Sequence, residues 1–186
     1  MTGTYDGARL RITEPGRPAG PQLSDPFPEF DFTSPCPPPP GGWTQLDPAK
    51  TTEAAVDKAI ADASAHPDFA GAWLDQYGGP GTPDNDPTKT VLTLQFTGDL
   101  AAHEARARKV WGGSLCVRRA AYSDADLKRI AAEVQTLPGH YEVMVDVTTN
   151  SVRLGMYATD AAAQRRLDTR YGPGAVRVAG LLQPID

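Results

Sequence analysis

The chain has 186 residues, 40% of them hydrophobic, and a net charge of −5. This acidic balance, with an isoelectric point near 5.2, argues against a nonspecific nucleic-acid binder, because such proteins carry a basic face. No apolar run reaches the roughly eighteen residues of a membrane span, and the N-terminal region lacks the apolar segment of a signal peptide.

The N-terminal residues 1–45 are predicted to form an extended, proline-rich tail. Ten of the eighteen prolines lie there, and no apolar periodicity supports a helix or a strand. An extended chain has no reason to expose large apolar side chains to water, so we expect the aromatic residues of the tail to contact a surface. That surface is either this protein's own domain or a partner protein. The aromatic residues predicted to bind are Phe27, Phe30, Phe32 and Trp43.

Residues 46–186 carry the patterns of an ordered domain. Asp47 and Pro48 are typical of a helix start, and Pro67 ends the predicted helix after His66. Strict alternation of apolar and polar residues predicts a strand over 90–97. The remaining predicted elements are a strand over 68–76, a helix over 99–111, a strand over 114–120, a helix from 123 to 137, a hairpin over 141–158, a helix over 159–171 and a strand around 176–178.

From residue 69 onward this order is ββαβαββαβ, after a leading helix. Hairpin-like connections require antiparallel pairing, so we expect an α+β fold with a single mixed or antiparallel sheet and helices on one face. The other face of the sheet is expected to be open. Alternation assigns to it Thr93, Gln95, Arg118, Met144, Asp146, Arg153, Tyr157 and Arg177.

The two cysteines, Cys36 and Cys116, are predicted to form a disulfide. Cys36 lies in the stiff stretch "SPCPPPPGGW", which has no means of entering a core by itself. Cys116 has the opposite parity to Leu115 and Val117, which places it on the open face, where an extended segment could cross the sheet. The alternative is a pair of reduced thiols in a cytosolic protein; a bridge would indicate a secreted or extracytoplasmic one.

No catalytic constellation is apparent. The histidines His66, His103 and His140 are scattered, without an HExxH or CxxC motif or a spacing typical of zinc ligands. No phosphate-binding glycine loop and no Gly-x-Ser-x-Gly elbow are present. We therefore expect no enzyme activity, no cofactor and no metal site.

Several segments together resemble the propeptide domain of secreted bacterial trypsin-like proteases of the streptogrisin and α-lytic type. They are "FAGAWLDQ", "TVLTLQFTGDL", "VRRAAYSDADLKRIAAEV" and "EVMVDVTTNSVRLGM", and the resemblance spans residues 69–178. It implies a small α+β domain that binds a trypsin-like domain through its sheet and its C-terminal segment, as folding helper and inhibitor. The sequence departs from this pattern in ending at Asp186, so we expect a propeptide-like domain without an attached protease.

These observations predict a secreted, non-catalytic binding module or adaptor that engages one or more partner proteins through its tail and open sheet. A trypsin-like domain is the partner that the resemblance suggests, and adaptors of secreted toxin particles have a similar plan. Three alternatives stay open. The first is a stand-alone protease inhibitor, and the second is an enzyme whose cysteine- or histidine-based site the sequence does not reveal. The third is a cell-envelope protein whose lost N-terminus was an anchor.

Overall fold

The computed structural model describes residues 2–6, 9–14, 26–77, 86–160 and 162–182. Contacts between Cα atoms divide the chain into two compact units. Unit 1 comprises residues 1–29, 127–146 and 151–186, and unit 2 comprises residues 30–126 and 147–150. The division into a tail of residues 1–45 and a domain of residues 46–186 remains a prediction.

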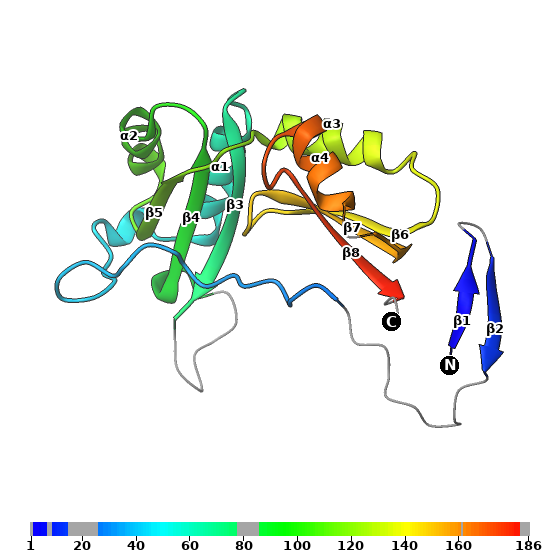
Figure 1. The fold of residues 1–186 in the computed structure, drawn as a ribbon. Coiled ribbons are helices and arrows are strands. Elements are labelled where there is room, and N and C mark those ends of the chain that lie inside the picture. Colours follow the sequence, from blue (N-terminus) through cyan, green and yellow to red (C-terminus); the bar gives the residue numbers. More distant parts are fainter. Residues whose placement is uncertain (1, 7–8, 15–25, 78–85, 161, 183–186) are drawn as a thin grey trace. The chain divides into compact units, whose positions relative to one another are not determined.

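Unit 2 contains a three-stranded sheet in the order β3-β4-β5, where β3 and β4 are antiparallel and β4 and β5 are parallel. Asp99 begins the second helix of this unit, because its carboxylate accepts hydrogen bonds from the backbone amides of Ala101 and Ala102. The elements of the unit are α1 (Glu53–Ser64), β3 (Phe69–Gln76), β4 (Thr90–Phe96), α2 (Leu100–Val110) and β5 (Ser114–Arg119) (Figure 1).

The hydrophobic core of unit 2 lies between the two helices and one face of this sheet. Alternation along β4 turns its apolar side chains to the helices, as the sequence predicts. Trp111, which ends α2, is fully buried, and its indole Nε1 donates to the Ser114 carbonyl at 2.9 Å. The cluster consists of Val56, Ala59, Ala63, Leu92, Leu94, Phe96, Ala107, Trp111 and Leu115.

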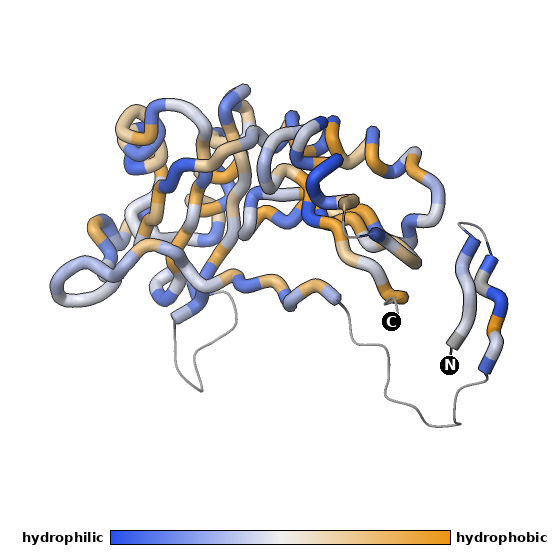
Figure 2. The backbone as a smooth tube through the Cα atoms, viewed as in Figure 1, coloured by the Kyte–Doolittle hydropathy of each residue, from blue (hydrophilic) through white to orange (hydrophobic). Residues whose placement is uncertain are grey.

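Unit 1 contains a second three-stranded sheet, in the order β6-β7-β8, again with one antiparallel and one parallel pair. Along α3, hydrophobic and hydrophilic positions are interspersed (Figure 2), and Leu127, Ile130 and Val134 are buried. The elements are α3 (Asp124–Val134), which begins at the border of unit 2, β6 (His140–Asp146), β7 (Ser151–Ala158), α4 (Ala163–Tyr171) and β8 (Val176–Leu182).

The two sheets are topological repeats. Each is reached from a helix, continues as an antiparallel strand pair, and adds a parallel third strand after a second helix. The first strand of each sheet carries an irregularity at the same place, between Phe69 and Gly71 in β3 and between His140 and Glu142 in β6. The pairing registers therefore make Asp75 equivalent to Asp146, and Thr93 equivalent to Arg153.

The structure confirms the α+β class and the predicted order of elements, but the prediction of a single sheet is wrong. The described residues form three sheets, and the third is a hairpin of β1 (Thr2–Tyr5) and β2 (Leu10–Glu14). This hairpin lies in the tail for which no strand is predicted. The strand β1, TGTY, is polar and contains a glycine, but β2, LRITE, alternates Leu10 and Ile12 with polar residues, a signal that the prediction overlooks.

Two further predictions are corrected. The first helix begins later than predicted, since Asp47 caps only a short 3-10 turn and Thr52 caps α1. The second face of the sheets is not uniformly open. Thr93, Gln95, Asp146 and Arg153 are at most 4% exposed, whereas Met144 and Tyr157 on the same face are exposed.

Candidate functional site

A disulfide between Cys36 and Cys116 fixes the segment after residue 30 to β5, with a Cα–Cα distance of 5.8 Å, inside the usual range for such bridges. Leu115 belongs to the core cluster and Val117 packs against it, so Cys116 points to the opposite face of the sheet, as its parity predicts. The predicted bridge is therefore confirmed. It places an extended segment on the face that the helices of unit 2 leave uncovered.

A second contact holds this segment on β3, and two aromatic side chains precede it. The backbone amide of Ser34 donates to Asp75 Oδ2 at 2.8 Å. Phe30 and Phe32 stack, with ring centroids 5.9 Å apart and planes inclined by 20°. Phe32 remains 47% exposed. The segment thus presents Phe32, stacked on a half-buried Phe30, to solvent on a backbone that is fixed to the sheet.

The proline run after Cys36 ends in a tight turn. The Gly42 amide donates to the Pro39 carbonyl at 2.8 Å, and Gly41 and Gly42 both have positive φ, which is why glycine is required there. The turn brings Trp43 back to the sheet, where it lines a cavity of about 350 Å³ together with Arg108 and Leu115. Trp43 is partly buried, and it docks the segment on its own unit.

Phe27 occupies a different environment, in unit 1. It is 9% exposed, and the Arg153 guanidinium lies 5.6 Å from its ring centroid. Arg153 also donates to the Pro28 carbonyl at 2.6 Å and pairs with Asp146 at 2.7 Å. Of the four aromatic residues predicted to bind a partner, Phe32 is therefore the most exposed and Phe27 the most buried. Their role in partner binding stays a prediction.

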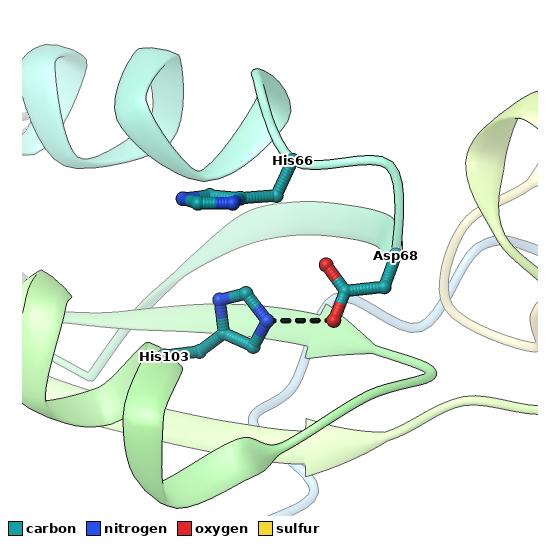
Figure 3. Close-up of side chains that lie close together, drawn as sticks. All are labelled: His66, Asp68 and His103. Carbon is teal, nitrogen blue, oxygen red and sulfur yellow. Dashed lines mark hydrogen bonds and ion pairs between the residues drawn. The ribbon is translucent and has the colours of Figure 1, made fainter.

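A cluster of polar side chains that the sequence analysis does not connect lies at the other end of unit 2. His66 follows the end of α1, Asp68 immediately precedes β3, and His103 lies in α2 (Figure 3). One ligand atom from each side chain lies within 4.8 Å of the other two. His103 Nε2 and Asp68 Oδ2 are 2.7 Å apart, and the two imidazoles meet edge to face with centroids 5.1 Å apart.

The environment of this cluster keeps the His103 ring in place. His103 is 5% exposed and stacks on Phe96, with centroids 3.7 Å apart and planes inclined by only 3°. Burial alone would raise the pKa of the Asp68 carboxyl. The hydrogen bond from His103 and the charges of His103 and His66 outweigh this effect, so the pKa of Asp68 is lowered.

No sequence motif connects these three residues. His66 and Asp68 are neighbours in the chain, but His103 is 35 residues beyond Asp68. The position of each residue next to a predicted element is the signal that could have found the cluster. The start of β3 lies beside the end of β4, because Phe69 pairs with Phe96. His103 lies near the start of α2, the helix that follows β4. A predicted hairpin with its two flanking helices would have brought the three side chains to one edge.

Comparisons with known proteins found no family model and no curated protein that matches this chain. Among the described residues, no helix combines the length and apolar character needed to cross a membrane. Residues 183–186, the end of the C-terminal segment that the resemblance implicates in binding, lie outside the described residues. Functional inference therefore rests on the geometry of the anchored segment and the histidine cluster.

Proposed function

We propose that this protein is a secreted, non-catalytic binding module that engages a partner protein through the anchored segment of residues 30–36. The observation that carries the proposal is the stacked pair of Phe30 and Phe32, with Phe32 47% exposed. The Cys36–Cys116 disulfide supports an oxidising compartment, because such bridges rarely persist in the cytosol.

The way the segment is held favours binding over simple exposure. The disulfide and the hydrogen bond from Ser34 to Asp75 restrict the backbone before any partner arrives. A restricted segment loses less conformational entropy on association, and aromatic side chains in such positions contribute strongly to affinity. A single exposed phenylalanine does not by itself indicate a binding site, but a stacked pair on a restricted backbone favours one.

The partner we propose is a trypsin-like protease domain. Its support is the resemblance of residues 69–178 to the propeptide domains of streptogrisin and α-lytic type proteases. The resemblance implies that a trypsin-like domain is bound through the sheet and the C-terminal segment. Inhibition of the protease is the second form that this function could take, because an extended segment has the shape of a protease substrate.

The test is calorimetric titration of the full chain with streptogrisin-type and α-lytic-type protease domains. The variants are Phe30→Ala/Phe32→Ala and, as a matched control, Leu46→Ala, which removes an apolar side chain that is 70% exposed outside the segment. We expect the double substitution to weaken binding by at least about tenfold and the control to leave it unchanged.

Two results would contradict the proposal. One is the absence of binding to either protease domain at protein concentrations of about 100 μM, where a specific protein–protein interface of standard size would be saturated. The other is binding that the double substitution leaves intact. Self-association that is lost in the double variant would instead identify a second copy of the chain as the partner. Peptide hydrolysis measured in the same titration separates inhibition from binding alone.

A further inference from the structure

The side chains of His66, Asp68 and His103 form a donor set that suits a transition-metal ion. Two imidazoles and one carboxylate are the ligands of many three-residue zinc sites, which keep a fourth position for water. Zinc lies about 2.0–2.2 Å from such nitrogen and oxygen atoms, so two ligands of a tetrahedral ion are about 3.4 Å apart. The separations here bracket that value, from 2.7 Å between His103 and Asp68 up to the limit of 4.8 Å.

The backbone around these donors is fixed, so that only side-chain rotation is needed to close the site. The Asp68 carbonyl accepts from the Thr97 amide at 2.9 Å, which ties the residue to the end of β4. The His66 amide donates to the Ala63 carbonyl, and the His66 carbonyl accepts from the Phe69 amide, both at 3.1 Å. Pre-positioned ligands of this kind raise metal affinity, because little ordering remains to be done on binding.

The orientation of the His103 ring directs one nitrogen to the site. Nε2 of this ring faces the Asp68 carboxylate at 2.7 Å, and Arg106 lies 3.5 Å from Nδ1. An ion would lie between Nε2 and the carboxylate, so the Nε2 proton that now joins them would be released and a proton would be carried on Nδ1. Because Arg106 can only donate, its guanidinium would turn from Nδ1 into the adjoining cavity, which it lines.

Space for a water ligand adjoins the two histidines. They line a cavity of about 360 Å³ between α1 and α2, and Arg106, Leu94 and Phe96 also line it. Gly98 also makes room, since a Cβ at that position would collide with the Asp68 carboxylate. The cluster is thus open on the cavity side and closed on the side of the sheet.

We propose that His66, Asp68 and His103 bind one divalent transition-metal ion per chain, with zinc as the favoured ion. Nitrogen-rich, three-residue coordination disfavours magnesium and calcium, which take oxygen ligands in larger number. The site goes beyond the proposed partner binding, because it lies in unit 2 away from the disulfide and uses none of the aromatic residues of the segment.

The test uses the full chain without a histidine tag, titrated calorimetrically with zinc chloride and, separately, with magnesium chloride. We expect one zinc ion per chain, a rise in melting temperature with zinc, and neither effect with magnesium. Cobalt(II) provides a spectroscopic readout, because a four-coordinate site gives intense visible absorption. Absence of zinc binding at about 100 μM would overturn the proposal.

Matched variants locate the ion. His66→Gln and Asp68→Asn keep the size of each side chain and are expected to weaken zinc binding by at least about tenfold. His140→Gln removes the remaining histidine of the chain and should bind zinc as the wild type does. Circular dichroism establishes that each variant is folded. Zinc binding that survives both His66→Gln and Asp68→Asn, or that is lost in His140→Gln, would place the ion elsewhere and refute the site.

Discussion

Arg153 shows how a single buried cation can hold several parts of unit 1. Its guanidinium pairs with Asp146, donates to the Pro28 carbonyl and lies over the ring of Phe27. Both members of the ion pair are nearly inaccessible, with side chains 5% and 1% exposed. Removing one partner of such a pair leaves a buried charge without compensation, which is more damaging than removing both.

We predict that Arg153→Ala lowers the free energy of unfolding by about 3–5 kcal/mol, because Asp146 stays buried without its cation. Urea unfolding measures the change. The control is Arg166→Ala, which removes a pair with Asp160 whose side chains are both 63% exposed, and no measurable change is expected there. Equal effects of the two substitutions would show that burial does not decide the strength of the Arg153 pair.

Thr93 illustrates the opposite situation, a buried hydroxyl that no described residue satisfies. Its side chain is fully buried, and its Oγ1 has no hydrogen-bond partner among the described residues. The nearby Thr90 is 4% exposed, but its Oγ1 donates to the Asp86 carbonyl at 2.7 Å. The two threonines belong to the same strand and are both buried, but only the Thr90 hydroxyl has a hydrogen-bond partner among the described residues.

Thr93→Val is therefore expected to leave stability unchanged or to raise it, since the desolvated hydroxyl is replaced by a methyl group of the same shape. Thr90→Val should lower the free energy of unfolding by about 1 kcal/mol, the usual contribution of one such hydrogen bond. Thermal and urea unfolding of the two variants in parallel provide the comparison. A larger loss for Thr93→Val than for Thr90→Val would mean that the Thr93 hydroxyl has a partner after all.

Among the helices, α4 packs least tightly. None of its residues is buried, and a cavity of about 590 Å³ lies beside it, with Leu154, Leu167 and Val178 among the lining residues. Its described hydrogen bonds to β8 come from the Gln164 side chain, which donates to the Val176 carbonyl and accepts from the Val178 amide. In contrast, α2 buries His103 and Ala107 against the core of unit 2. Elements with few buried contacts open at lower free energy than the rest of a protein.

Amide hydrogen exchange should therefore be faster in α4 than in α2, although the two helices occupy equivalent positions in the repeats. Mass spectrometry of peptides covering each helix measures the difference. Similar protection in both helices would show that another contact stabilises α4. Leu154→Phe, which adds volume next to the cavity, should slow exchange in α4 if the cavity is the cause.

Local patterns were sufficient to predict most elements, because alternation and capping act over a few residues. The hairpin of β6 and β7 forms within the predicted range of residues 141–158, and its apolar residues share one face, with Val143 opposite Leu154 and Val145 opposite Val152. Ser123 caps α3 as predicted, through a hydrogen bond from the Asp126 amide. The separation into two sheets could not be predicted this way, since both sheets have the same local periodicity and only long-range pairing distinguishes them.

At the scale of the whole molecule, the same ordering of elements occurs twice, and residues of the N-terminal region bond to a side chain of each repeat. In unit 2 the Ser34 amide binds Asp75, and in unit 1 Pro28 binds the Arg153 that is paired with Asp146. The two cysteines predict that the segment around Ser34 lies on the sheet of unit 2. The contact between Pro28 and Arg153 could not be predicted, because alternation assigned Arg153 only to an open face.

Breaking the disulfide tests how much the anchoring of this segment contributes to the stability of the protein. We predict that reduction of the wild-type protein lowers its free energy of unfolding by about 4 kcal/mol, because the bridge closes a loop with a sequence separation of 80 residues. Thiol titration should find no reactive thiol before reduction and both cysteines after it. A double Cys36→Ser/Cys116→Ser variant as stable as the oxidised protein would refute the expected contribution.

The Cys36–Cys116 bridge also closes a covalent ring in which α1, β3, β4 and α2 are all contained. A single backbone cleavage anywhere within this ring opens it without separating the chain, because the two pieces remain joined through sulfur. A nicked molecule would therefore migrate as one species until a reductant is added and as two afterwards. In an environment rich in proteases, unit 2 could be cut once in any of its enclosed connections without losing a fragment.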